Sequence, residues 1–543
     1  MIRPLLRRAA LSGLVATLAL PVAAAEAKPN LFSVMMDDDQ LVYRDDDTRD
    51  RALRRMKDLG VDQVRVTVLW SVVADGARKT KALDKRFRKL KADNPKAYPR
   101  LNWDRYDRLV RAARRLGIGI YFNVTGPGPE WGHAKAPRSQ ARNKKTWKPK
   151  PKEFYKFVQA VGKRFSGRYR DENDERVILP KVGVWSLWNE PNQGGWLTPQ
   201  FVNGRPYSPH LYRELYDHGY RALVSTGHAG DVIMMGETAP LGSSNPSSRA
   251  PMRPAQFLRE MFCVDGNLQP LQGAEAAARK CSFWDKKGKL NATWWAHHPY
   301  TKNKSPQARD ANPDSITMAN IGDLATLLDG IAANTARIRS GVDILSAEFG
   351  FETNPPDPFS GIDPKLQANW NALGELQAFL HPRVVGQTQF LLYDVPPRRQ
   401  YRRGSKSYWF TYQSGLYTNR GVAKPAATQY AFPFLVFPTG TTEPSNGRPH
   451  LTAWGGLRFR QEGVADDVAV DWKPADGSTD WQPIGSTKTN QPIQLDPAQS
   501  PIQVFEGYFY IPAFTVPGPG KVRMRLSIPQ APFHYTSQEF DVQ

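Results

Sequence analysis

The sequence has 543 residues, too many for one compact domain of about 100–200 residues, although an α/β barrel alone can take about 250 or more. Hydrophobic residues make up 40% of the chain and aromatic residues 11%, so a packed core is expected rather than a disordered chain. The formal net charge is +22, and such an excess attracts anionic partners where it is concentrated on one surface.

The N-terminal segment has the three parts of a secretory signal peptide. Residues 1–8 carry basic side chains, residues 9–22 form an apolar run, and small residues precede a cleavage site after Ala27. A membrane anchor is the alternative, but the apolar run is shorter than the roughly 20 residues that span a bilayer. The sequence therefore predicts a signal peptide over residues 1–27 and a secreted or extracytoplasmic protein without stable membrane insertion.

Apolar, β-rich runs then alternate with amphipathic helical stretches, a pattern typical of a parallel sheet covered by helices. The helical stretches include residues 48–59, 103–116 and 153–165. Eight runs are predicted as strands: residues 31–36, 63–70, 118–125, 182–189, 232–236, 293–297, 343–347 and 386–393. Because eight βα units in succession close most naturally into a barrel, residues 28–439 are predicted to form an α/β fold of the (β/α)8 TIM-barrel type.

The pattern changes from about residue 440. Short runs in which apolar and polar residues alternate take over, as in residues 522–528, and Gly, Pro and Asp turns separate these runs. The sequence therefore predicts a small C-terminal antiparallel β-sandwich over residues 440–543.

The chain has two cysteines, Cys263 and Cys281. In an oxidising compartment an even pair this close together is most simply a disulfide that closes one loop. A metal site is the weaker interpretation, because two thiols without a nearby His or a second Cys pair make only half a site.

Two of the predicted strands lead into the main candidate catalytic carboxylates. The first runs through Trp188 and Asn189 into Glu190, where Pro191 stops it, and the second ends at Glu348, three strands later. Groups at the C-terminal ends of barrel strands project into the active site. Cleavage of a glycosidic bond needs two carboxylates, one to protonate the leaving oxygen and one to attack the anomeric carbon or activate water. A solvated charge or an ion-pair partner is the alternative for either residue alone.

The Trp-Asn-Glu-Pro-Asn motif at residues 188–192 gives the chain a family resemblance. Over roughly residues 31–437 it resembles the clan of retaining glycoside hydrolases whose barrels carry the acid/base on strand four and the nucleophile on strand seven. Within that clan it is similar to glycoside hydrolase family 39, with family 5 close behind. The resemblance implies that Glu190 is the acid/base and Glu348 the nucleophile.

The same resemblance implies roles for four further residues. Asn189 matches the residue that holds the sugar 2-hydroxyl, and Arg65 on strand two matches the arginine beside the nucleophile, which keeps a carboxylate ionised. His298 and Tyr300 match the pair that orients the nucleophile or contacts the sugar. For Arg65 a structural ion pair is the alternative, and for Tyr300 ordinary packing.

Aromatic side chains at or just past strand ends could stack on a sugar face or pack in the core. Four residues are candidates for substrate binding: Trp70, Trp131, Tyr393 and Trp409. Strand eight departs from the clan pattern, which usually ends that strand with Trp, whereas Tyr393 stands here. Glu237 closes strand five and Glu130 follows strand three; either could bind substrate, and Glu237 is the reserve candidate for a catalytic role.

The positive charge is concentrated in three loops. Residues 76–100 hold ten Lys or Arg and two Asp, residues 132–152 hold eight Lys or Arg, and residues 397–406 hold five. These loops follow predicted strands two, three and eight, so they belong to the catalytic face of a barrel. One interpretation is a basic bias in solvated loops; the other is a positive rim that attracts an anionic substrate.

The sequence thus predicts a retaining glycosidase that acts on an extracellular carbohydrate, with an anionic glycan among the candidates and no cofactor or metal required. A non-catalytic carbohydrate-binding barrel and a transglycosylase that uses the same two glutamates stay open as alternatives. A nucleic-acid or envelope-binding protein is disfavoured, because a carboxylate pair does not serve phosphate chemistry without a metal. The sugar, the linkage and the oligomeric state stay open.

Overall fold

The computed structural model describes residues 31–458, 463–491, 506–527 and 534–542. The predicted signal peptide, residues 1–27, lies outside the described residues. In the described part of the chain, no helix has the length and apolar character needed to cross a membrane.

Eight parallel strands form a closed barrel, as predicted, in the order β1-β10-β9-β8-β7-β4-β3-β2. The barrel strands are β1 (Phe32–Met36), β2 (Gln63–Leu69), β3 (Gly119–Thr125), β4 (Val184–Leu187), β7 (Val232–Thr238), β8 (Trp294–His297), β9 (Asp343–Phe349) and β10 (Val384–Phe390). Strands β5 (Phe201–Val202) and β6 (Arg205–Pro206) form a separate small hairpin.

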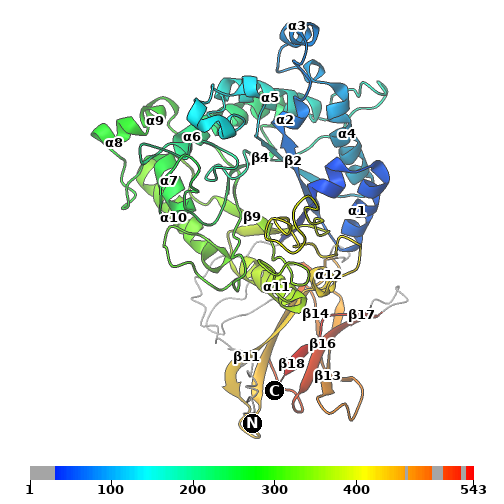
Figure 1. The fold of residues 1–543 in the computed structure, drawn as a ribbon. Coiled ribbons are helices and arrows are strands. Elements are labelled where there is room, and N and C mark those ends of the chain that lie inside the picture. Colours follow the sequence, from blue (N-terminus) through cyan, green and yellow to red (C-terminus); the bar gives the residue numbers. More distant parts are fainter. Residues whose placement is uncertain (1–30, 459–462, 492–505, 528–533, 543) are drawn as a thin grey trace, which may run out of the picture.

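Helices connect and cover these strands (Figure 1). They are α1 (Asp46–Asp58), α2 (Trp70–Val73), α3 (Lys81–Leu90), α4 (Arg100–Arg115), α5 (Pro151–Arg164), α6 (Ser208–Leu223), α7 (Pro254–Phe262), α8 (Gly273–Ala278), α9 (Ser282–Lys287), α10 (Ile321–Thr335), α11 (Pro364–Leu380) and α12 (Pro425–Ala431). Local signals fix several helix starts: the side chain of Asp45 accepts a hydrogen bond from the backbone of Thr48 at 2.8 Å, and Asp363 caps α11 ahead of Pro364.

Short 3-10 and π turns complete this part of the chain. They are η1 (Asp39–Tyr43), η2 (Pro95–Ala97), η3 (Glu130–Gly132), η4 (Arg138–Asn143), η5 (Val224–His228) and η6 (Met318–Asn320).

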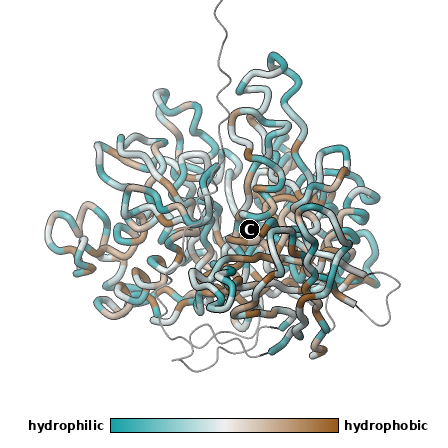
Figure 2. Tube along the Cα trace, turned by 90° about the horizontal axis from the view of Figure 1, so that it is seen from below, coloured by the Kyte–Doolittle hydropathy of each residue, from teal (hydrophilic) through white to brown (hydrophobic). Residues whose placement is uncertain are grey.

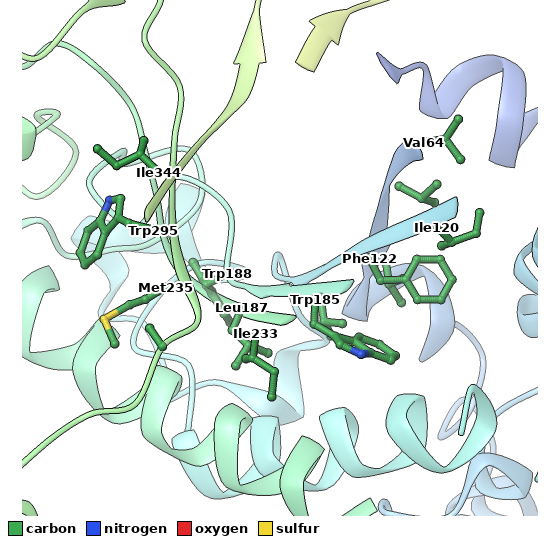
Figure 3. Close-up of a cluster of buried hydrophobic side chains, with 14 of the residues drawn as sticks. Val64, Ile120, Phe122, Trp185, Leu187, Trp188, Ile233, Met235, Trp295 and Ile344 are labelled. Atoms are coloured by element: carbon green, nitrogen blue, oxygen red, sulfur yellow. The ribbon is translucent and has the colours of Figure 1, made fainter. Parts of the chain in front are cut away.

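Apolar and polar side chains alternate along the barrel strands. The apolar ones form an outer layer under the helices, and the polar ones face the interior at the C-terminal end of the barrel. Val64, Phe122 and Trp185 belong to the buried cluster between the strands and the helices (Figure 3). Arg65 and Tyr121, which are register partners on β2 and β3, lie together, with the guanidinium carbon 5.7 Å from the ring centre. Because successive side chains of a strand point to opposite faces, the apolar positions hold the helices and their neighbours are free to build a site.

The predicted C-terminal sandwich is present as two antiparallel sheets. One sheet contains β11 (Phe434–Thr442), β12 (Pro449–Gly456) and β15 (Tyr508–Phe514); the other contains β13 (Asp467–Pro474), β14 (Gln482–Lys488), β16 (Gly520–Ser527), β17 (His534–Thr536) and β18 (Phe540–Val542). A second apolar cluster, which includes Phe434, Val470 and Met524, fills the space between them. The proposed ranges 28–439 and 440–543 stay a prediction, since β11 runs across residue 440.

The sandwich packs against α11 of the barrel. Glu375 of α11 is buried, pairs with Arg458 and accepts a hydrogen bond from the Tyr508 hydroxyl at 2.6 Å. Phe379 lies 5.6 Å from the ring of Trp454. In Figure 2, hydrophobic segments gather toward the middle of the molecule, and hydrophilic segments dominate the outer loops.

The predicted disulfide between Cys263 and Cys281 is confirmed. It joins the residue after α7 to the residue before α9, with the two Cα atoms 5.9 Å apart. The bond therefore closes a loop within the segment that connects β7 to β8.

Candidate active site

The structure brings Glu190 and Glu348 together at the C-terminal end of the barrel. Glu190 follows β4, and Glu348 lies near the end of β9. A carboxylate oxygen of Glu190, one of Glu348 and a ring nitrogen of His298 all lie within 4.8 Å of one another. The backbone N–H of Glu190 donates to the carbonyl of Glu237 at 2.9 Å, which ties the turn after β4 to β7.

Glu348 is held by two donors. Its Oε1 lies 2.9 Å from Arg65 Nη1, and its Oε2 accepts a hydrogen bond from the Tyr300 hydroxyl at 3.1 Å. Burial raises the pKa of Glu348 above its ordinary value, against the opposing charges of His298 and Arg65, and the carboxylate of Glu190 adds to the rise. The carboxylate of Glu190 therefore disfavours the ionised form of Glu348, and the charges of His298 and Arg65 favour it.

Asn189 is oriented by its neighbours. Its Oδ1 accepts a hydrogen bond from Arg65 Nη2 at 2.7 Å, and its backbone N–H donates to Thr125 Oγ1 at 2.9 Å. With the amide oxygen engaged, the amide NH2 group is the part that can donate to a substrate hydroxyl.

His298 lies between three carboxylates. Its Nδ1 is 3.1 Å from Glu190 Oε1 and 3.6 Å from Glu348 Oε2, and its Nε2 is 2.5 Å from Glu237 Oε2. Burial lowers the pKa of a histidine, but Glu348, Glu190 and Glu237 outweigh burial and raise the pKa of His298 to about 10. His298 is therefore an imidazolium at neutral pH.

Glu237, the reserve candidate, is fully buried behind the pair. It accepts hydrogen bonds from Arg65 Nη2 at 2.9 Å, from His298, and from the hydroxyls of Tyr121 and Ser186. Burial alone would raise the pKa of Glu237, yet the charges of Arg65 and His298 hold it well below its ordinary value. Glu237 is thus an ionised carboxylate without access to substrate.

The four aromatic residues predicted to bind substrate make contacts with residues outside this cluster. Trp70 is 0% exposed and stacks on Phe157 with 5.5 Å between ring centres, so it offers no face to a sugar and is not a stacking platform. Trp131 packs edge-on against Trp70 at 5.7 Å. The hydroxyl of Tyr393 accepts a hydrogen bond from Arg55 of α1 at 2.8 Å.

Trp409 is half-buried in the loop after β10, where its ring packs edge-on against the neighbouring Tyr408 with 5.0 Å between ring centres. For Trp131, Tyr393 and Trp409 a role in substrate binding stays a prediction. Glu130, the other carboxylate considered for substrate, is exposed and pairs with Lys144 at 2.7 Å.

Two aromatic residues that the sequence analysis missed lie beside the pair. Phe390, at the end of β10, packs edge-on against Tyr412 at 5.2 Å and against Tyr300 at 6.1 Å. Tyr412 is 55% exposed, and partial burial of its hydroxyl together with the charges of Glu348 and Glu190 raises its pKa. The ring of Tyr412 therefore borders the site and is open to solvent, as a stacking surface must be.

Asp38 is a further carboxylate at the site that the sequence analysis did not single out. It follows β1, and its Oδ1 accepts a hydrogen bond from the backbone N–H of Thr67 at 3.0 Å. Burial raises the pKa of Asp38 to about 6; Glu348 adds to the rise and Arg65 opposes it. The signal that could have found it is its position, since Asp38 stands just past the end of the first strand.

In the described residues, Glu190, His298 and Glu348 have donor atoms close enough to share a metal ion. A metal ligand must be deprotonated, and imidazole binds a metal through a neutral ring nitrogen. Both nitrogens of His298 face carboxylates, its pKa is about 10, and Glu348 is occupied by Arg65. Each of the three residues thus already has a hydrogen-bond or ion-pair partner within the site.

The fold and the site together define a (β/α)8 barrel with a carboxylate pair at the ends of its fourth and seventh strands, backed by an arginine and an imidazolium. No protein-family model and no curated protein matches the sequence.

Among solved structures, the chain is similar to a GH5_18 protein from Streptomyces cattleya, with 17% identity, a TM-score of 0.42, and coverage of 74% of this chain and 78% of that chain. It is similar to a glucosidase from Croceicoccus marinus, with 11% identity and a TM-score of 0.44 over 90% of this chain and 97% of that chain. It is also similar to the endo-β-1,4-mannanase from Thermotoga petrophila, with 11% identity and a TM-score of 0.40 over 95% of this chain and 98% of that chain. These structural neighbours are glycoside hydrolases.

Proposed function

We propose that this protein is a secreted retaining glycoside hydrolase that cleaves a polysaccharide or oligosaccharide by double displacement. The observation that carries the proposal is the pairing of Glu190 with Glu348: one carboxylate oxygen of each lies within 4.8 Å of the other, at the end of the barrel that holds active sites. Carboxyl groups about 5–5.5 Å apart serve direct attack on the sugar, whereas inverting enzymes separate theirs by about 6.5–9.5 Å to admit a water.

In the first step, Glu348 attacks the anomeric carbon while Glu190 gives its proton to the leaving oxygen, so the glycosidic bond breaks as the glycosyl-enzyme ester forms. In the second step, Glu190 takes a proton from water, and the oxygen of that water displaces Glu348 from the anomeric carbon. The enzyme returns to its starting protonation state, and the sugar keeps its anomeric configuration.

The surroundings of the two glutamates support this division of roles. Glu348 accepts from Arg65 and Tyr300, and the charge of Arg65 favours its ionised form against the burial and the neighbouring carboxylates that raise its pKa. The side chain of Glu190 is 21% exposed against 10% for Glu348, so Glu190 lies on the side from which a leaving group departs and water enters. Asn189 is oriented to donate to the sugar 2-hydroxyl, a contact that strengthens at the transition state.

The test is the stereochemistry of hydrolysis. The purified protein is given a panel of aryl glycosides of known anomeric configuration, and proton NMR follows the first-formed sugar before it mutarotates. We expect an initial product with the configuration of the substrate. An initial product of opposite configuration would contradict double displacement, and binding without turnover across the panel would favour the carbohydrate-binding alternative.

We further propose that the substrate is an anionic glycan selected by the three basic loops at residues 76–100, 132–152 and 397–406. They leave the barrel after β2, β3 and β10, at the end where Glu190 and Glu348 lie. Almost all of their lysines and arginines are exposed, apart from half-buried Arg78 and Lys148. A ring of exposed positive charge around a site raises the local concentration of an anionic substrate.

Salt should therefore act on the polymer and not on a small neutral substrate. Because charges in water are screened over about 8–10 Å at physiological salt, raising salt is expected to increase KM for the polymer several-fold. The value of kcat for a neutral aryl glycoside should stay nearly unchanged. Steady-state kinetics across a salt series measures both quantities.

A charge-neutralised variant provides the control. Four exposed residues of the second loop are replaced by Gln: Lys135, Arg138, Arg142 and Lys145. This variant should behave at low salt as the unchanged protein does at high salt. The matched variant neutralises four exposed residues in the last turns of α1 and α4, away from the site: Arg54, Lys57, Arg114 and Arg115. Equal effects of the two variants, or a neutral best substrate, would reject the role of the loops.

A further inference from the structure

Glu237 occupies a distorted point of the barrel. The pairing of β7 with β8 shifts register between Gly236 and Thr238, so Glu237 is the extra residue of a β-bulge. Its φ is +51°, in the left-handed region that non-glycine residues rarely adopt, and Gly236 beside it has φ +107°. Bulges next to active sites re-aim a side chain, and here the bulge directs a carboxylate into the barrel.

Each carboxylate oxygen of Glu237 already has two hydrogen-bond donors. Oε2 lies 2.9 Å from Arg65 Nη2 and 2.5 Å from His298 Nε2, while Oε1 accepts from the hydroxyls of Tyr121 and Ser186. The side chain is 0% exposed. With four donors on two oxygens and no exposed surface, Glu237 cannot contact a sugar, so its effect must pass through its neighbours.

Arg65 and His298 each bridge Glu237 to the reacting pair. Arg65 uses Nη2 for Glu237 and Nη1 for Glu348, at 2.9 Å in both cases. His298 uses Nε2 for Glu237, which leaves Nδ1 to face Glu190 at 3.1 Å. A protonated ring is required for both nitrogens to donate.

We propose that Glu237 is a positioning residue, which holds His298 as a doubly protonated imidazolium and fixes it, together with Arg65, against Glu190 and Glu348. This role rests on the proposed glycosidase function. The hydrogen-bonded network then contains three carboxylates and two cations, so one proton shared by Glu190 and Glu348 makes it neutral. The network thereby favours the singly protonated pair that double displacement needs.

The groups around His298 come from several elements. Glu190 follows β4, Glu237 lies on β7 and Glu348 lies on β9. The adjacent His297 is neutral because burial lowers its pKa to about 3. Arg65 of β2 pairs with both Glu237 and Glu348. Three anions thus face one imidazolium, and this arrangement agrees with a pKa of about 10 for His298.

The test replaces Glu237 by Gln, which keeps the shape of the side chain but removes its charge. Loss of an anion this close should lower the pKa of His298 by about 1–3 units. The ring of His298 is followed between pH 6 and 10 by 15N NMR of histidine-labelled protein, and its signal is assigned by its absence in His298→Gln. In the same variant, the alkaline limb of kcat should move to lower pH, because the carboxylate pair that shares one proton loses a neighbouring anion that favours holding it.

Two further variants separate positioning from stability. Asp107→Asn removes a buried carboxylate of α4 that also pairs with an arginine, Arg164, at 2.6 Å; it should lower Tm without changing the titration of His298. Glu237→Asp keeps the charge and should restore much of the wild-type titration and pH profile.

A neutral His298 at pH 8 in the unchanged protein would overturn the proposal. So would a His298 pKa in Glu237→Gln equal to that in the unchanged protein. If Glu237→Gln fails to fold, the titrations of the unchanged protein and of Glu237→Asp decide. A third outcome separates the two proposals. If no glycoside is turned over, the proposed function is wrong. If the pKa of His298 is nevertheless near 10 and falls in Glu237→Gln, the effect of Glu237 on the charge of His298 is still supported.

Discussion

Replacing Glu348 by Ala is expected to abolish turnover of every glycoside, whatever the quality of its leaving group. Without this carboxylate no covalent intermediate can form, and a good leaving group cannot compensate for a missing nucleophile. Loss of a nucleophile that acts as part of a unit costs roughly 10⁴–10⁶-fold in kcat, so the residual rate should be near the detection limit. Initial rates on dinitrophenyl and simple alkyl glycosides measure the effect.

The matched control for this variant is Glu352→Ala, four positions further along the same chain segment. Glu352 is only half-buried, and burial together with the charge of Asp357 raises its pKa to about 7. Its removal should change kcat by no more than a few-fold. A Glu348→Ala protein that is folded, by its melting curve, and still turns over dinitrophenyl glycosides at a tenth of the normal rate would exclude Glu348 as the nucleophile.

The barrel could be predicted from the sequence because its strands are buried on both faces. Such strands are rich in apolar and β-branched residues, and they recur between helical stretches with the spacing of βα units. The exact residue at which a strand ends could be predicted less well from the sequence. The fourth strand was expected over residues 182–189 but ends at Leu187, and Trp188 and Glu190 have φ of +72° and +37°. Hydrophobicity does not encode such left-handed backbone, which aims the side chains at the site.

The convergence of Glu190 and Glu348 could be predicted because strand ends of one barrel meet at one face. The separate role of Glu237 could not be predicted from the sequence. Glu237 and Glu348 look alike there, because each is a glutamate at the end of an apolar strand. Packing distinguishes the two: Glu237 has no exposed surface, whereas the side chain of Glu348 is 10% exposed. That difference depends on a bulge of one residue, which leaves no mark on the hydrophobic pattern.

The aromatic residues show where the strand-end argument fails. Trp70 stands where a platform was expected, but it is the first residue of α2 and its ring turns outward onto Phe157 of α5. Tyr412 reaches the site from a long loop after β10, through its contact with Phe390. A loop without periodicity gives no sequence signal for the direction of its side chains, so only the folded chain identifies Tyr412.

The counterpart of the Glu348 experiment is Glu190→Ala, which should divide substrates by their leaving groups. Dinitrophenyl glycosides need no proton, so their glycosyl-enzyme should still form, whereas alkyl glycosides should lose roughly 10²–10⁴-fold in kcat/KM. Hydrolysis of the intermediate should then be slow, because no base activates water. A burst of dinitrophenol followed by a slow steady state is the expected trace.

Azide should restore turnover of the glycosyl-enzyme in Glu190→Ala, because azide is an anionic nucleophile that needs no general base. The missing carboxylate leaves space for it beside His298, which lies 3.1 Å from Glu190 in the unchanged protein. The product expected from Glu190→Ala is a glycosyl azide with the configuration of the substrate, because two displacements have occurred. In Glu348→Ala, azide can only displace the leaving group directly, which gives the opposite configuration. NMR of the two azides therefore assigns both glutamates in one comparison. Exchanged configurations of the two azides would reverse the roles of Glu190 and Glu348. Identical behaviour of the two variants on activated substrates would mean that the two residues do not have separate roles.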